Sequence, residues 1–191
     1  MKPQPRPLLS ASAKEVVVRP AVIEDLPRLT DIYNHYVVNT ATTFDLDPFT
    51  VDERRAWFAH YAPSGRHRLI VAERDGYIAG YASSSPFHPR RAYETTVEMT
   101  VLCAPEAVGY GIGRRLYEAL LPALRGEDVH RAAALITLPN RGSCALHERF
   151  GFRHAMTITE AGRKFGRYWD VAWYVRDMPS GATGLREEGA S

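Results

Sequence analysis

Seven segments of the chain combine the length of β-strands with a high content of apolar and β-branched residues. They are residues 16–19, 68–73, 77–84, 95–103, 131–138, 152–158 and 168–175. Asp75-Gly76 separates the second segment from the third and is a strong hairpin signal. Alternation in the fourth segment places one set of side chains on one face and a second set on the other. The first set is Val97, Met99, Val101 and Cys103, and the second is Glu98, Thr100 and Leu102.

Four further segments have the spacing of amphipathic helices. The first carries Leu26, Leu29, Ile32, Tyr33, Tyr36 and Val37, and the third carries Leu116, Leu120 and Leu124. Thr50 and Glu53 form a capping box that starts the second helix, which we expect to run to about Tyr61. Pro122 should kink or shorten the third helix. Asn140 or Ser143 caps the fourth, which Gly151 ends. This order of strands and helices predicts a mixed α/β sheet.

Composition limits the class of protein. The 191 residues suggest one domain, which we place at residues 15–178 between flexible tails at 1–14 and 179–191. A net charge of +2 does not point to nucleic acid, and no apolar run is long enough for a membrane span. Cys103 and Cys144 are too few for a disulfide framework, so both should be reduced thiols in a cytoplasmic protein. We expect no metal site.

A buried acid and a glycine-rich turn carry the candidate chemistry. Glu98 lies inside an apolar strand, where a carboxylate is costly unless it is paired in a salt bridge or used. Residues 109–113 then open a helix, and backbone N–H groups at a helix start bind anions. A dinucleotide fingerprint is excluded because Arg114 stands where its last glycine belongs, and the Gly-Lys-Ser/Thr of a nucleotide-triphosphate loop is absent. The remaining interpretation of residues 109–113 is a phosphate cradle near Glu98. The alternative is a turn without a binding role.

A strand followed by R/Q-x-x-G-x-G and a helix resembles the acetyl-CoA motif of the GNAT acetyltransferase superfamily. Within it, the chain resembles the phosphinothricin and methionine sulfone/sulfoximine N-acetyltransferases. The matching pieces are residues 32–36, 90–93, 96–101, 109–113, 140–148, 151–152 and 164–170. The resemblance implies the GNAT fold, an α/β (α+β) class with a mixed, mostly antiparallel sheet of six to seven strands and about four helices. It also implies an acetyl-CoA-dependent N-acetyltransferase, cytoplasmic and homodimeric, that detoxifies a small amine acceptor.

The resemblance assigns roles to individual residues. Glu98 becomes the general base, directly or through water, and His147 protonates the leaving thiolate or orients a group. The residues expected to bind acetyl-CoA are Val101, Leu102, Cys103, Gly109, Tyr110, Gly111, Ile112, Gly113, Arg114 and Asn140. Arg90 is the first candidate for the acceptor's anionic group because its fork of donors matches such groups. Its possible neighbours at the acceptor are Phe44, His88, Tyr93, Thr100 and Lys164. For Phe44, Asn140 and His147 the plain alternatives are a loop anchor, a helix cap and a structural histidine.

Three positions depart from the pattern of the relatives. Val108 stands where the superfamily motif usually has Gln or Arg, and His88 and Glu94 replace basic residues of the methionine sulfone enzymes. These changes affect the acceptor more than the reaction. Another small amine or a protein N-terminus is therefore the alternative acceptor. A non-catalytic acyl-CoA sensor is an alternative of another class, against which Glu98 and His147 together argue.

Overall fold

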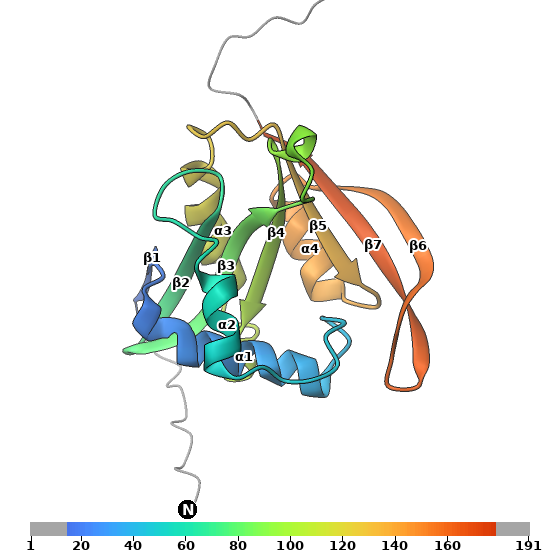
Figure 1. Ribbon diagram of the computed structural model, residues 1–191, viewed down its shortest axis with the longest axis horizontal. Helices are drawn as coiled ribbons and strands as arrows, with labels where there is room; N and C mark the ends of the chain where they lie inside the picture. The colour runs from blue at the N-terminus through green and yellow to red at the C-terminus, as the bar shows by residue number, and fades with distance from the viewer. Residues whose placement is uncertain (1–14, 179–191) are drawn as a thin grey trace, which may run out of the picture.

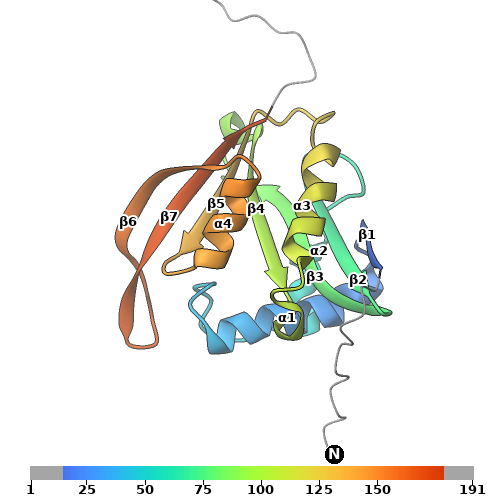
Figure 2. The ribbon, with the colours of Figure 1, turned by 180° about the vertical axis from the view of Figure 1, so that it is seen from behind.

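A computed structural model describes residues 15–178 as a seven-stranded sheet with helices on both faces (Figures 1 and 2). The strands follow the spatial order β1-β2-β3-β4-β5-β7-β6, and only the pair β4–β5 is parallel. Their bounds are β1 Val16–Pro20, β2 Arg68–Arg74, β3 Tyr77–Pro86, β4 Thr96–Cys103, β5 Arg131–Thr137, β6 Arg153–Lys164 and β7 Arg167–Asp177. The predicted mixed, mostly antiparallel sheet is confirmed. The two predicted tails lie outside the described residues.

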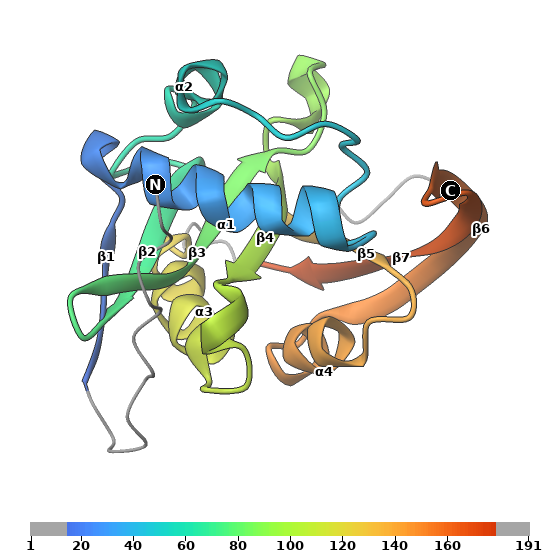
Figure 3. The same ribbon diagram turned by 90° about the horizontal axis from the view of Figure 1, so that it is seen from below.

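Four α-helices cover the sheet, as the helical spacing predicts. They are α1 Leu26–Asn39, α2 Val51–Phe58, α3 Ile112–Ala123 and α4 Arg141–Arg149, and three short 3₁₀ turns, η1 Ile23–Asp25, η2 Arg91–Tyr93 and η3 Pro105–Ala107, link other elements. Helices α1 and α2 lie on one face, and α3 and α4 on the other (Figure 3). The α3 helix ends one residue after Pro122, so the expected shortening is confirmed. The α2 helix stops at Phe58, three residues before the predicted end.

Strands β4 and β5 pair only at one end. Their register joins Thr96 to Arg131, Val97 to Ala132 and Glu98 to Ala133, and beyond these residues the two strands diverge (Figure 1). Beyond the point of divergence each strand keeps its outer neighbour, because β4 pairs with β3 from Val97 to Cys103 and β5 pairs with β7 from Arg131 to Thr137. The β4 backbone after Glu98 therefore has a free edge that faces the opening, where an extended ligand can pair with it.

The hairpin of β6 and β7 is longer than the sequence predicts. The sequence predicts strands at residues 152–158 and 168–175 joined by a loop that contains residues 162–166, but Gly162, Arg163 and Lys164 pair with β7. The register shifts between Ile158 and Gly162, and Glu160 adopts a left-handed φ of 53°. This bulge breaks the alternation on which a strand prediction depends, and the strand resumes after it. The hairpin consequently extends to the loop between α1 and α2, against which it packs at Gly162 and Lys164.

Candidate active site

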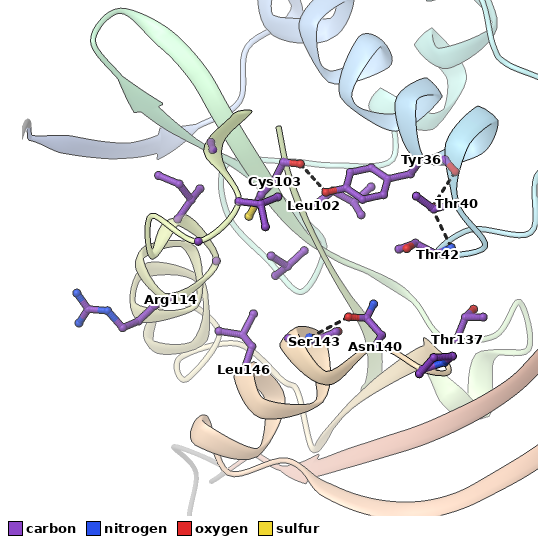
Figure 4. A pocket seen from close by; sticks show the side chains of 18 of the residues that line it. Tyr36, Thr40, Thr42, Leu102, Cys103, Arg114, Thr137, Asn140, Ser143 and Leu146 are labelled. Carbon is purple, nitrogen blue, oxygen red and sulfur yellow. Dashed lines mark hydrogen bonds between the residues drawn. The ribbon is translucent and has the colours of Figure 1, made fainter. Parts of the chain in front are cut away.

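The opening between β4 and β5 contains a cavity of about 850 Å³, called the larger cavity here (Figure 4). It reaches from the end of β4, past the glycine loop, to the start of α4. Nine of the ten residues predicted to bind acetyl-CoA line it: Val101, Leu102, Cys103, Gly109, Gly111, Ile112, Gly113, Arg114 and Asn140. The tenth, Tyr110, does not line it, and the Arg74 guanidinium lies over its ring at 4.7 Å.

The glycine loop adopts the conformation of an anion cradle. Gly109 and Gly111 have φ of +87° and +75°, a region that other residues rarely adopt, and Gly111 is the N-cap of α3. The first N–H groups of α3 have no acceptor inside the helix. A Cβ on Gly113 would lie 3.0 Å from Leu146 Cδ2, so this glycine lets α3 approach α4 closely. The loop backbone and the helix dipole together suit a pyrophosphate.

The Arg114 side chain is not part of this cradle. Its Nη1 donates to Glu118 Oε1 at 2.7 Å, and the side chain points away from the cavity (Figure 4). Arg114 therefore contributes its backbone, while Val108, at the position where related motifs carry a polar residue, is exposed. Main-chain N–H groups are therefore the donors that this loop can offer to an anion.

Tyr36 and Asn140 frame the opening from opposite sides (Figure 4). The Tyr36 hydroxyl donates to the Cys103 carbonyl oxygen at 2.7 Å, and burial raises the pKa of Tyr36 to about 12, so it stays a donor. Asn140 Oδ1 accepts from the Ser143 N–H at 3.1 Å, which confirms the helix-cap role. Asn140 also lines the cavity, so capping and ligand binding are compatible at this residue.

Next to the larger cavity lies a second one of about 450 Å³, called the Glu98 cavity here. The two share Thr42, Val101, Leu102, Thr137, Asn140 and Ser143 as lining residues. Ser85 Oγ donates to the Glu98 carbonyl oxygen at 3.3 Å, but within residues 15–178 no ion pair or hydrogen bond to the Glu98 carboxylate is found, which argues against the salt-bridge alternative. Desolvation raises the pKa of Glu98 above its ordinary value. A half-buried, unpaired carboxylate in a cavity is typical of a general base.

His147 also lines the Glu98 cavity, but both of its ring nitrogens are occupied. Nδ1 donates to the Ser143 carbonyl oxygen at 2.8 Å, so Nε2 of the neutral ring accepts from the Tyr117 hydroxyl at 2.8 Å. The side chain is only 3% exposed, and burial lowers its pKa. This geometry favours an orienting role, because proton donation from Nε2 would require protonation and loss of the Tyr117 hydrogen bond. Tyr117 is not among the site residues predicted from the sequence.

The loop between α1 and α2 supplies one wall of the Glu98 cavity through Phe44. The Phe44 ring packs on Gly162, where a Cβ would lie 2.4 Å from the ring. Lys164 Nζ is buried and donates to the Thr43 carbonyl oxygen at 2.8 Å. Both predicted roles of Phe44, loop anchor and wall, are therefore compatible. Lys164 holds this loop and does not line the Glu98 cavity. Thr100, in contrast, lines it as predicted.

Arg90, His88 and Tyr93 lie together on an exposed segment before β4. The rings of His88 and Tyr93 are 4.8 Å apart, and Tyr93 contacts Phe87, whose ring is 5.7 Å from that of Trp173. Trp173 lines the Glu98 cavity, whereas none of the three predicted residues lines it in the described structure. Their contact with an acceptor remains a prediction.

A third cavity of about 320 Å³, called the Arg54 cavity here, shares Tyr33 and Thr100 with the Glu98 cavity. This cavity was not predicted from the sequence. The one available signal is that Arg54, Trp57 and Phe58 stand at i, i+3 and i+4, which places the arginine on the inward face of α2. Among residues 15–178 no group of metal-binding side chains is found, and no helix there is long and apolar enough to cross a membrane.

Comparison with known proteins agrees with this geometry. Residues 29–152 match the model of the acetyltransferase (GNAT) family. The chain is 56% identical to a phosphinothricin N-acetyltransferase of Streptomyces coelicolor over 86% of this chain and 97% of the relative. It is 33% identical to an L-methionine sulfoximine/L-methionine sulfone acetyltransferase of Pseudomonas aeruginosa, covering 82% and 91%. A solved Sinorhizobium meliloti phosphinothricin acetyltransferase in complex with AcCoA superposes with a TM-score of 0.82 at 32% identity, covering 90% and 94%. The chain belongs to the GNAT family of acetyltransferases.

Proposed function

We propose that this enzyme transfers the acetyl group of acetyl-CoA to the α-amine of a small amino-acid-like acceptor, of the phosphinothricin, methionine sulfoximine or methionine sulfone type. The observation that carries the proposal is the unpaired Glu98 carboxylate in a cavity adjoining the glycine-loop cavity. The names of the Streptomyces and Pseudomonas relatives support the class of acceptor.

The residues of the larger cavity fit acetyl-CoA. The first N–H groups of α3 and the glycine loop would hold the pyrophosphate, because Gly109 and Gly111 allow the positive φ angles that this loop adopts. The edge of β4 opposite β3, which no strand covers at Val101, Leu102 and Cys103, would pair with the amides of the pantetheine arm. Acetyl-CoA supplies the activated thioester. The lining residues that the two cavities share support a reaction at the junction of the cavities.

Glu98 accounts for the proton that the acceptor must lose. An α-amine is largely protonated at neutral pH, and Glu98 accepts one proton, directly or through water, to leave a nucleophilic nitrogen. That nitrogen forms the C–N bond to the thioester carbonyl carbon, the C–S bond breaks, and the thiolate takes up the second amine proton. A raised Glu98 pKa brings this base closer to the working pH. Backbone N–H groups of β4 are suited to the developing oxyanion.

His147 positions groups around this reaction. Its Nδ1–H donates to the carbonyl oxygen of Ser143, which belongs to the first turn of α4. Asn140 caps the same turn. The neutral ring thereby supports the wall that both cavities share. A direct transfer of a proton from His147 to the thiolate is the competing role.

A thiol-release assay with acetyl-CoA tests the proposal. The panel contains phosphinothricin, methionine sulfoximine, methionine sulfone, plain amino acids and a short peptide. We expect the three analogues to have the highest kcat/KM values. Fastest acetylation of the peptide would overturn the amino-acid acceptor, and acetyl-CoA binding without turnover on any acceptor would favour the sensor alternative.

We also propose a cytoplasmic homodimer that serves detoxification and binds neither nucleic acid nor membranes. The exposed apolar side chains of Met156, Ile158 and Phe165 on the β6–β7 hairpin support an interface between copies there. Light scattering coupled to gel filtration gives the mass, and a monomer at micromolar concentration would refute the dimer.

A further inference from the structure

The Arg54 cavity lies beneath α2, on the same face of the sheet as Glu98. Arg54 and Trp57 enter it from α2, Tyr33 from α1, and Tyr81 and Ser83 from β3. In the register of β3 and β4, Ser83 pairs with Thr100 and Ser85 with Glu98, so these side chains share one face. Tyr33 and Thr100 line both cavities. The Arg54 cavity is therefore a neighbour of the site at which Glu98 would receive the amine.

The Arg54 guanidinium is buried with a free donor edge. Arg54 is 5% exposed, and its Cζ lies 3.7 Å from the centre of the Trp57 ring and 4.2 Å from that of Tyr33. These contacts use the π face of the guanidinium. Nε and Nη2, whose N–H groups point side by side along one edge, have no hydrogen-bond partner in the described structure. Such an edge matches the two oxygens of a carboxylate.

The carboxylates around Arg54 bind other groups. Asp45 accepts from the Tyr33 hydroxyl and from Thr43 Oγ1, and Glu53 accepts from Thr50 N at 2.7 Å and Thr50 Oγ1 at 2.8 Å. No ion pair to Arg54 is found among residues 15–178, although an unpaired buried cation is costly. The Tyr81 hydroxyl, also fully buried in this cavity, likewise has no hydrogen-bond partner there. Three buried donors without a hydrogen-bond partner in the described structure therefore belong to residues that line one cavity.

We propose that the Arg54 cavity binds the α-carboxylate of the acceptor, with Nε–H and Nη2–H of Arg54 donating to its two oxygens and the Tyr81 hydroxyl to one of them. The inference rests on the proposed function and names the specificity site within it. The amine of the acceptor then faces Glu98, and its carboxylate passes between Tyr33 and Thr100. A peptide has an amide in place of this carboxylate, so the site selects free amino acids.

This assignment separates two arginines. Arg54 binds the carboxylate, which every α-amino acid carries, and Arg90 is left for an anionic tail such as a phosphinate. Methionine sulfone is the useful probe because its carboxylate is its only anionic group. Its α-carboxamide removes that charge and keeps the tail. The amine of the amide is less basic, so more of it is neutral and nucleophilic at neutral pH. Intrinsic reactivity therefore favours the amide, whereas the Arg54 cavity predicts a preference for the free acid.

The experiment compares kcat/KM for L-methionine sulfone and its α-carboxamide. We expect the parent enzyme to prefer the free acid by about ten- to a hundredfold, mainly through KM. Arg54→Met should bring the two acceptors to within threefold of each other, and Arg54→Lys should restore only part of the preference because a point charge lacks the fork. Arg55→Met is the matched control, because Arg55 is exposed on the same helix and pairs with Asp52. It should keep the full preference.

Each outcome decides between the two proposals. A parent enzyme that acetylates no amino acid overturns the proposed function and this inference with it. Turnover of methionine sulfone with no preference over the amide, or a preference that survives in Arg54→Met, overturns the carboxylate site alone. Thermal denaturation reports whether Arg54→Met folds. If Arg54→Met does not fold, the test uses Tyr81→Phe. A smaller preference for the acid over the amide than in the parent supports the carboxylate site, and an unchanged preference overturns it.

Discussion

Replacing Glu98 by Gln removes a proton acceptor and leaves the size of the side chain unchanged. Because no ion pair to Glu98 is found in the described structure, the change breaks no salt bridge. Glu98 does not line the larger cavity, so acetyl-CoA affinity should be nearly unchanged. Loss of a general base typically costs about 10²–10⁴-fold in rate, or about 3–5 kcal/mol of barrier. We expect this loss in kcat.

The pH dependence gives a second measure of the same side chain. Desolvation raises the Glu98 pKa, so the acidic limb of kcat/KM should lie above the ordinary value of 4.5, and Glu98→Gln should abolish it. A carboxyl group whose pKa is raised by folding stabilises the fold at low pH and loses that contribution as pH rises through the folded pKa. Glu98→Gln should therefore raise the melting temperature at pH 7 and leave it nearly unchanged below pH 4.5.

Steady-state kinetics from pH 6 to 9, calorimetry with acetyl-CoA and thermal melts together test this reasoning. A Glu98→Gln variant within threefold of the parent across that range would exclude Glu98 as the base. Weakened acetyl-CoA binding would instead mean that the two cavities are less separate than their lining residues indicate.

Three further predictions concern the cofactor loop, the buried histidine and the acceptor arginine. Gly111→Val should abolish or weaken acetyl-CoA binding in calorimetry, because a φ of +75° costs a non-glycine residue about 1–2 kcal/mol and the substitution would distort the cradle. Gly126→Val is the control, because Gly126 lies in open space and does not have a left-handed φ. His147 has a lowered pKa, so the unfolded chain binds more protons below about pH 6.5 and the free energy of unfolding should fall as pH drops through that value. His147→Gln should flatten this dependence in thermal melts between pH 5 and 7.5, and an unaltered slope would refute it. Arg90→Ala should raise the KM for phosphinothricin by about ten- to a hundredfold with acetyl-CoA binding unchanged, and Arg90→Lys should recover part of it; an indifferent Arg90→Ala would exclude the contact.

Local signals account for the parts of the fold that the sequence predicts well. Asp75 and Gly76 both adopt positive φ, as the Asp-Gly hairpin signal requires. The Thr50–Glu53 capping box is present at the start of α2. Each of these features depends on residues a few positions apart, so the sequence alone specifies it. The glycine loop belongs to the same class, since its left-handed positions coincide with Gly109 and Gly111.

Features that depend on distant segments were harder to predict. The divergence of β4 from β5 depends on which neighbours hold each strand, and no local pattern encodes it. The bulge around Glu160 interrupts the alternation of β6 and made a paired strand resemble a loop. Arg54 follows Asp52 and Glu53 in the first turn of α2, where charged residues are usually exposed. Only the packing of α2 against Tyr33 and β3 shows that its guanidinium is buried.

Glu98 and Arg54 together explain why an α-amino acid suits this site. The protein keeps a half-buried carboxylate and a buried guanidinium on one face of the sheet, and in the described structure neither has an ion-pair partner. Pairing them with each other would stabilise the fold but leave no charge for a ligand. A zwitterionic acceptor carries an ammonium group for Glu98 and a carboxylate for Arg54, separated by a single carbon. Under the two proposals, one small molecule satisfies both charges, whereas a simple amine or a peptide N-terminus satisfies only the first.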